Sequence, residues 1–426
     1  MVLNRRRDAG SVPDTFLLDE PDAVAPVLQP VLDLEHNAVA GYEALARVSS
    51  AFPPWTATQM FRWARRTGRT TELDWVCRCA AFRTALACGL RPPMPILVNA
   101  EPSALDSGAP AAVLDDLRMA RRELRVVVEL TERELADNPV QLFRVVDSMR
   151  ALGWEIAVDD VGAEPISLAL LPLLDPDVIK LDRAVIVDPT AAEHARTALA
   201  VAAEANRTGA AVVAEGVETL EQRETARALG ARYAQGFFWG QPGRAVRPDL
   251  PTAPLPLPRQ ARLLRRGLSG PSVAAVHRRL LNERELDAAV QVLLAVAGAD
   301  PAAAVIASWP RAARADGWRL HLAGCVRRVA FVGSASNEEG SCELMALSPS
   351  LAVALVARPA YREGRWEVDV LHGRSQVIEL GQRLVRGVTH HGAVLSHQPI
   401  VTLQRQSRHS GGNSPTSTPA RPTVTA

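Results

Sequence analysis

Short runs of β-branched and other apolar residues alternate with longer helix-like segments from about residue 27 to about residue 241. This alternation is typical of repeated βα units around a parallel sheet. Eight runs have the composition of strands, namely residues 27–34, 39–46, 96–99, 126–130, 155–159, 178–181, 211–215 and 234–237. Eight such strands predict an α/β fold in which a TIM-like (β/α)8 barrel closes on itself.

The segments between these runs are rich in Ala, Leu and Arg, and several end at Gly, which predicts helices. They are residues 56–66, 72–87, 139–152, 191–206 and 220–229. Only residues 35–38 separate the first two strand candidates, which is enough for a hairpin but not for a parallel crossover. One strand of the barrel is therefore expected to be antiparallel.

Prolines are concentrated after the last run, with five of them between residues 248 and 258. This density resists helix and sheet and indicates an extended linker. Beyond it, apolar runs such as residues 329–332 and 352–356 and a closing helix near 375–385 predict a smaller α/β domain. The final residues are rich in Ser, Thr, Pro and Gly and are expected to be disordered. The expected organisation is a tail (1–22), a barrel (23–246), a linker (247–269), a second domain (270–400) and a tail (401–426).

Composition narrows the class of partner. The 426 residues carry 48 basic and 47 acidic side chains, so we expect a small ligand and no nucleic-acid partner. The most apolar stretch, residues 288–307, contains Asp300 and Pro301, and no apolar run follows the N-terminal arginines. We therefore expect no membrane span and no secretory signal. Five scattered cysteines without metal-ligand spacing favour a cytoplasmic location.

Polar oxygen ligands recur at, or just after, the ends of the predicted strands. They are Glu43, Asn99, Glu129, Asp159, Asp160 and Glu215. The carboxyl ends of barrel strands open onto one face, so these side chains are expected to converge and to need a positive counter-charge. Oxygen-only ligands suit Mg²⁺ or Mn²⁺, and adjacent aspartates suit a two-metal site that activates water for phosphodiester cleavage. A lone strand-end carboxylate is more often a helix cap, so only the joint pattern favours a metal site.

Lys180 is the only lysine among the 48 basic residues. A chain that otherwise uses arginine and keeps one lysine at a strand end indicates a place that requires a compact ammonium. There it would orient the attacking water or stabilise charge on a phosphate. The alternative is a stray lysine without a function.

An ordered series of motifs runs along the predicted strands. It consists of QPVLD (29–33) with GYEALAR (41–47), then VN (98–99), ELTE (129–132), DDVG (159–162), IKLD (179–182), AEGVET (214–219) and QGFF (235–238). In order and spacing, this series resembles EAL-domain cyclic di-GMP phosphodiesterases. The resemblance implies a barrel that hydrolyses cyclic di-GMP to linear pGpG with divalent metal ions and that pairs as a homodimer.

The resemblance also implies a role for each matching residue. One metal ion would be held by Glu43, Asn99, Glu129 and Asp159, and a second by Asp159, Asp160 and water. The nucleophilic water would be handled by Lys180 and by Glu215, the general base. The substrate phosphate or guanine would contact Gln29, Arg47 and Gln235, with a surface cation as the alternative role for Arg47. The loop after Asp159 and the far wall of the site would be supported by Glu132 and Glu218.

The loop at residues 161–168 departs from the family. The sequence VGAEPISL stands where the family has FGTGYSSL, so this loop is stiffer and loses a glycine. In the family this loop couples dimerisation to metal binding, which puts regulation and turnover in doubt but leaves the ligands unchanged. Two alternatives to an active enzyme follow: a receptor that binds cyclic di-GMP with little turnover, and a barrel that serves as a scaffold for the second domain.

The region from about residue 277 to 388 resembles DICT-type sensory domains through residues 348–356, 366–370 and the closing helix. His372, His390 and His391 have no acidic partner at a fixed spacing, so no catalytic set is expected there. The expected role is a sensory or interaction module for an unknown ligand or protein.

Overall fold

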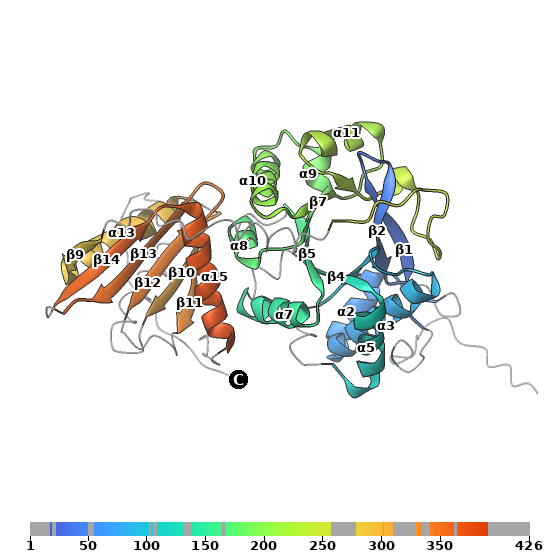
Figure 1. Ribbon diagram of the computed structural model, residues 1–426, viewed down its shortest axis with the longest axis horizontal. Coiled ribbons are helices and arrows are strands. Elements are labelled where there is room, and N and C mark those ends of the chain that lie inside the picture. Colours follow the sequence, from blue (N-terminus) through green and yellow to red (C-terminus); the bar gives the residue numbers. More distant parts are fainter. Residues whose placement is uncertain are drawn as a thin grey trace, which may run out of the picture. The chain divides into compact units, whose positions relative to one another are not determined.

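The computed structural model describes residues 18, 23–49, 55–101, 104, 109–131, 139–162, 167–256, 278–300, 302–309, 329–333, 341–361 and 364–390. Within these residues, the strands form a closed barrel and a six-stranded sheet (Figure 1). The predicted tail at 401–426 and nearly all of the tail at 1–22 lie outside the described residues.

The barrel consists of eight strands in sequence order, as predicted. They are β1 (Val27–Asp33), β2 (Ala38–Leu45), β3 (Pro95–Asn99), β4 (Arg125–Thr131), β5 (Glu155–Val161), β6 (Val178–Leu181), β7 (Ala211–Ala214) and β8 (Tyr233–Ala234). Strands β2 to β8 run parallel to one another, whereas β1 is antiparallel to both β2 and β8. The short turn between β1 and β2 forces this reversal, and the prediction of one antiparallel strand is confirmed.

Helices connect the barrel strands, and five of them lie where composition predicted helices. The set is α2 (Ala57–Thr67), α3 (Thr70–Ala87), α5 (Leu114–Glu123), α7 (Pro139–Ala151), α8 (Ser167–Leu174), α9 (Arg183–Val187), α10 (Ala192–Thr208) and α11 (Leu220–Ala228), with 3-10 turns η1 (Ala111–Val113) and η2 (Phe237–Trp239). Thr56 and Thr219 begin α2 and α11 with capping boxes. Gly68 and Gly209 end α2 and α10 in the left-handed region. The sequence pattern missed α5, α8 and α9.

An apolar layer fills the interior of the barrel. It is one buried cluster of Val31, Ala40, Leu97, Val127, Ala157, Val178, Ala211, Val213, Tyr233 and Leu255. A larger cluster packs the other face of the strands against the helices. Because successive strand residues point to opposite faces, the side chain two positions along each strand also enters the interior. The apolar layer therefore supports whatever stands at the carboxyl ends of the strands.

Residues 251–256 of the predicted linker pack against the barrel. Leu255 is 2% exposed and belongs to the interior cluster, and its N–H donates to the carbonyl of Ala40. Arg125 donates to the carbonyl of Leu255 and pairs with Glu155 at 2.9 Å. The domain boundary at residue 246 stays a prediction, but the chain remains in contact with the barrel beyond it.

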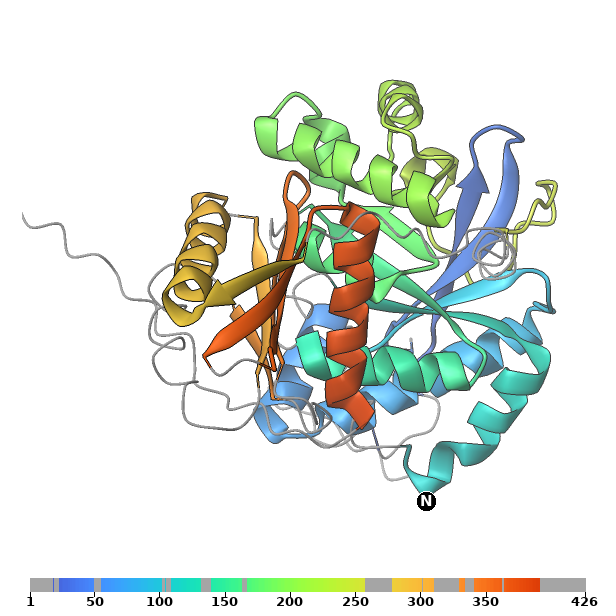
Figure 2. The ribbon, with the colours of Figure 1, turned by 60° about the vertical axis from the view of Figure 1, so that its left-hand side comes forward.

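A second sheet lies in the C-terminal part of the chain, and we call this sheet together with its two helices the C-terminal sheet. Its elements are β9 (Arg279–Asn282), α13 (Glu283–Ala299), β10 (Ala304–Trp309), β11 (Val329–Gly333), β12 (Cys342–Leu347), β13 (Ala352–Pro359), β14 (Arg365–Leu371) and α15 (Arg374–His390). The strand order is β11-β10-β12-β13-β14-β9. Alternate strand residues pack against α13 and α15, which cover opposite faces (Figure 2).

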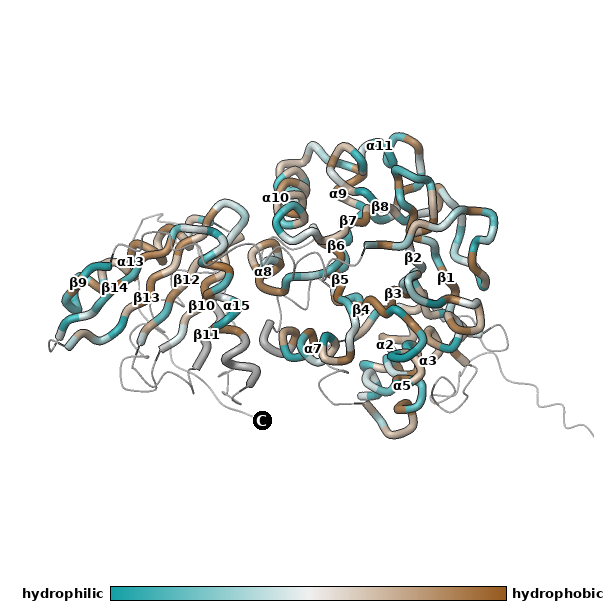
Figure 3. The backbone as a smooth tube through the Cα atoms, in the orientation of Figure 1, coloured by the Kyte–Doolittle hydropathy of each residue, from teal (hydrophilic) through white to brown (hydrophobic). Residues whose placement is uncertain are grey.

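Hydropathy follows this architecture. Helix α8 is hydrophobic along most of its length, whereas α11 is largely hydrophilic (Figure 3). Among the described residues, no helix combines the length and the hydrophobicity that a membrane span requires.

Candidate metal centre and active site

A ring of polar side chains stands above the apolar layer of the barrel. Two positions after Leu97 comes Asn99, and two positions after Val127 comes Glu129. The same step brings one polar residue each from β5 to β8 to the carboxyl end of the barrel. On β2, Glu43 comes three positions after Ala40, because the pairing of β1 with β2 shifts between Val31 and Leu32. The ring consists of Gln29, Glu43, Asn99, Glu129, Asp159, Lys180, Glu215 and Gln235.

The ammonium of Lys180 lies among four carboxylates. Its Nζ is 2.7 Å from Glu129 Oε1, 2.8 Å from Asp159 Oδ1, 2.8 Å from Glu215 Oε1 and 3.4 Å from Glu43 Oε2. The side chain of Lys180 is 1% exposed. A compact ammonium can face several carboxylates at once, which a planar guanidinium cannot do in the same space.

Amide side chains hold Glu43 from two sides. Asn99 Nδ2 donates to Glu43 Oε1 at 3.0 Å and to Glu129 Oε2 at 3.1 Å. Gln235 Nε2 donates to Glu43 Oε2 at 2.6 Å and to Gln29 Oε1 at 2.9 Å. Both glutamines are buried, and in this structure Gln235 orients Glu43 while Gln29 holds the amide of Gln235. Their contact with a substrate stays a prediction.

An irregularity in β5 brings its two aspartates to the same place. Neighbouring residues of a regular strand point to opposite faces. The pairing of β5 with β6 shifts between Val158 and Val161, and Asp160 has a φ of 55°. As a result, one oxygen each of Asp159, Asp160 and Glu215 lie within 4.8 Å of one another.

Burial and charge set the protonation of this ring. Burial and the neighbouring Glu43 raise the pKa of Glu129 well above its usual value, although Lys180 opposes this. Burial likewise raises the pKa of Glu215 well above its usual value, again against Lys180. Burial alone would raise the pKa of Glu43, but the charge of Lys180 and the hydrogen bond from Gln235 outweigh burial and lower this pKa. Burial would lower the pKa of Lys180, but the four carboxylates raise it well above its usual value.

The donor set fits a divalent cation. It consists of carboxylate oxygens, which Mg²⁺ and Mn²⁺ prefer, with the amide of Asn99 beside them, and it contains neither histidine nor cysteine. One ammonium faces four carboxylates, so the ring carries a surplus of negative charge. The choice between Mg²⁺ and Mn²⁺ stays a prediction.

The remaining predicted residues lie apart from this ring. Arg47 is half-buried, and its Nη1 donates to the carbonyl of Ala46 at 2.8 Å. Glu218 is exposed and pairs with Arg183 through two hydrogen bonds of 2.7 and 3.0 Å. This pair links the start of α9 to the loop after β7. Glu132 lies outside the described residues.

A buried ion pair behind Asn99 escaped the sequence prediction. Asp74 and Arg78 of α3 are 2% and 1% exposed and form a short ion pair. Asp74 Oδ1 accepts the N–H of Glu101 at 2.9 Å, and the guanidinium of Arg78 stacks 3.7 Å from the ring centroid of Trp75. The pair therefore anchors the backbone just after Asn99. Its i, i+4 spacing on a predicted helix was the available signal.

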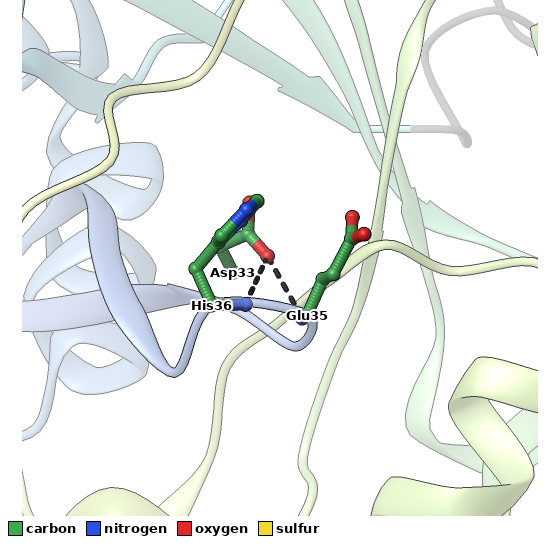
Figure 4. A group of neighbouring side chains, drawn as sticks. All are labelled: Asp33, Glu35 and His36. Carbon is green, nitrogen blue, oxygen red and sulfur yellow. Dashed lines mark hydrogen bonds and ion pairs between the residues drawn. The ribbon is translucent and has the colours of Figure 1, made fainter.

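A second acidic group lies at the turn between β1 and β2. Asp33, Glu35 and His36 are close enough to hold a cation (Figure 4). However, Asp33 Oδ1 accepts the backbone N–H groups of Glu35 and His36, and its Oδ2 lies 3.1 Å from Arg232 Nη2. Protein donors thus satisfy this carboxylate, and the group acts as a turn cap that ties β1 to the start of β8.

Comparison with known proteins places the barrel in a family. Residues 15–242 match the family model described as EAL domain. Because this match covers more than half of the chain, the chain belongs to the EAL-domain family. The resemblance inferred from the motifs is confirmed for the barrel, whereas the DICT resemblance of the C-terminal part stays a prediction.

Curated relatives resemble the barrel at moderate identity. The chain is 30% identical over 218 residues to the "Probable cyclic di-GMP phosphodiesterase PdeB" of Escherichia coli K12, covering 50% of this chain and 41% of that protein. It is 31% identical over 224 residues to the "Cyclic di-GMP phosphodiesterase NbdA" of Pseudomonas aeruginosa, covering 50% of this chain and 28% of that protein. The chain thus spans less than half the length of either relative.

Among solved structures, a Klebsiella pneumoniae BlrP1 calcium/cy-diGMP complex is similar to this chain. The sequence identity is 28%, the TM-score is 0.47, and the match covers 53% of this chain and 57% of that chain.

Proposed function

We propose that this chain is a metal-dependent phosphodiesterase that hydrolyses cyclic di-GMP to linear pGpG. The observation that carries the proposal is the ring of four carboxylates around Lys180 at the carboxyl ends of the barrel strands. The names of the relatives PdeB and NbdA support the choice of substrate.

Two divalent ions, Mg²⁺ or Mn²⁺, would complete the site. The first would be held by Glu43, Asn99, Glu129 and Asp159, and the second by Asp159 and Asp160. When bound, the ions would activate water and offset the charge of the phosphate. The oxygen-only donors and the surplus of negative charge support this assignment.

The protein residues would divide the remaining work. Glu215 takes the proton of the attacking water as general base, and Lys180 orients its carboxylate from 2.8 Å. The substrate phosphate or guanine contacts Gln29, Arg47 and Gln235. The site walls are supported by Glu132 and Glu218, and the pair of Glu218 with Arg183 supports the latter role.

The test is incubation of the purified chain with cyclic di-GMP and Mn²⁺ or Mg²⁺, followed by chromatography for linear pGpG. Glu215→Ala is expected to lower the rate by about 10²–10⁴-fold, the usual contribution of a general base. Glu221→Ala, at an exposed position of α11, is the matched control and should retain activity. Product that persists in EDTA would refute metal dependence, and tight binding without product would favour the receptor alternative.

Three further expectations belong to this proposal. We propose that two barrels pair as a homodimer, that the protein acts in the cytoplasm and that the C-terminal sheet receives an unknown ligand or protein. Sedimentation of the purified chain would test the first of these.

A further inference from the structure

Helix α8 is intrinsically weak and depends on its surroundings. It has eight residues, every one of them buried, and Pro172 lies inside it. A helix this short is marginal in water, and an interior proline removes one of its hydrogen bonds. Its packing must therefore keep it folded.

This helix is close to the proposed metal ligands. It begins at Ser167, seven positions after Asp160, and it packs against β5, the strand that carries Asp159 and Asp160. The conformation of α8 thus bears directly on the carboxyl end of β5.

Helix α15 of the C-terminal sheet covers α8. Gln382 is buried, and its Nε2 donates to the carbonyl of Pro172 at 3.1 Å. At Gly381, an added Cβ would lie 2.7 Å from Leu173 Cδ2 of α8 and 2.8 Å from Met345 Sδ of β12. Glycine in a helix interior is less stable than alanine, so a glycine there needs a reason. The close approach of α15 to both neighbours accounts for a glycine at this position.

The same helix contacts the strands of the C-terminal sheet. It packs against β10, β11, β12 and β13 as well as against α7 and α8. Leu380 and Leu384 of α15 share one buried cluster with Leu173 and with Val356 of β13. A displacement of the sheet would therefore reach α8 through close-packed side chains.

We propose that the C-terminal sheet controls the metal-ligand segment of the barrel through α15 and α8. In this arrangement α15 holds α8 folded, and α8 fixes the end of β5 that presents Asp159 and Asp160. The C-terminal sheet is then a regulator that acts within its own chain. The consequence for hydrolysis rests on the function proposed above, whereas the link from α15 to β5 does not.

Gly381→Leu in the full chain tests the link, because the new side chain drives α15 away from α8. The control is Ser375→Leu, which adds the same side chain at an exposed position of α15. Amide hydrogen exchange is measured without metal for peptides that cover residues 155–162 and 167–174. We expect exchange in both segments to rise by about tenfold or more in Gly381→Leu, as local opening becomes easier, and to stay unchanged in Ser375→Leu.

Faster exchange confined to residues 167–174, or to neither segment, would overturn the proposal. Gln382→Ala removes the hydrogen bond to Pro172 without introducing a clash and gives a milder second variant if Gly381→Leu does not fold. Calorimetric titration should then show that Gly381→Leu and Gln382→Ala, where folded, bind Mn²⁺ more weakly than the wild type does. If the wild type itself neither binds Mn²⁺ nor hydrolyses cyclic di-GMP, the proposed function fails, but the exchange data still decide the link from α15 to β5.

Discussion

The Nζ of Lys180 lies 2.7 Å from Oε1 of Glu129, and both side chains are almost completely buried. A buried ion pair of this kind depends on a compact ammonium, because only a compact group can also reach the other carboxylates of the ring. Lys180→Arg is therefore expected to abolish detectable hydrolysis, because the planar group cannot reproduce these contacts. Overpacking of this kind costs about 1–3 kcal/mol, so the barrel should still fold. Product formation and urea unfolding check the two parts.

Arg66→Lys, at an exposed position of α2, is the control for the opposite exchange and should change neither quantity. A near-normal rate in Lys180→Arg would show that this position needs only a positive charge.

Metal binding should stabilise the fold, and this stabilisation should require the carboxylates of the ring. A ligand at 100 times its Kd stabilises the native state by about 2.7 kcal/mol, so Mn²⁺ should raise the Tm of the wild type. Glu129→Gln keeps the shape of the side chain but removes a charged donor, and most of the rise should disappear. Thermal unfolding with Mn²⁺ or EDTA, without nucleotide, measures this. In Asp33→Asn, Mn²⁺ should still raise the Tm as it does in the wild type. If Mn²⁺ no longer raised the Tm of Asp33→Asn, the ion would be bound at the β1–β2 turn.

The strands and the acidic ring could be predicted because both depend on local patterns. Short continuous apolar runs define the strands, and a polar side chain at the carboxyl end of each parallel strand must reach the same face. The shift in β5 at Asp160 could not be predicted, since register depends on the neighbouring strand. The buried position of Leu255 was hidden by the prolines around it, which indicate an extended chain but not what that chain contacts. The absence of helical periodicity concealed α8, whose faces are all buried.

The carboxylate of Asp33 should make stability depend on pH. Burial tends to raise its pKa, but hydrogen bonds from His36, Glu35 and Arg232 prevail and lower it. A lowered pKa in the folded state contributes stability above the unfolded value of about 3.9 and loses it as the pH falls through the folded value. Asp33→Asn should therefore cost about 1–3 kcal/mol at neutral pH, and this difference should shrink below about pH 4. Urea unfolding of both proteins from pH 7 to pH 3 measures it, and a constant difference would contradict the assignment.

Leu255 should stabilise the barrel although it lies in a proline-rich stretch. Its side chain is 2% exposed within the interior cluster, and Arg125 holds its carbonyl at 2.6 Å. Removing a buried leucine to alanine costs about 2–5 kcal/mol, through lost contacts and a residual cavity. Leu199→Ala, at a position of α10 that is 73% exposed, should change the free energy of unfolding by less than about 0.5 kcal/mol. If Leu255→Ala and Leu199→Ala changed the free energy of unfolding in urea equally, residues 251–256 would not stabilise the barrel. A larger loss in Leu255→Ala would make this stretch part of the barrel fold.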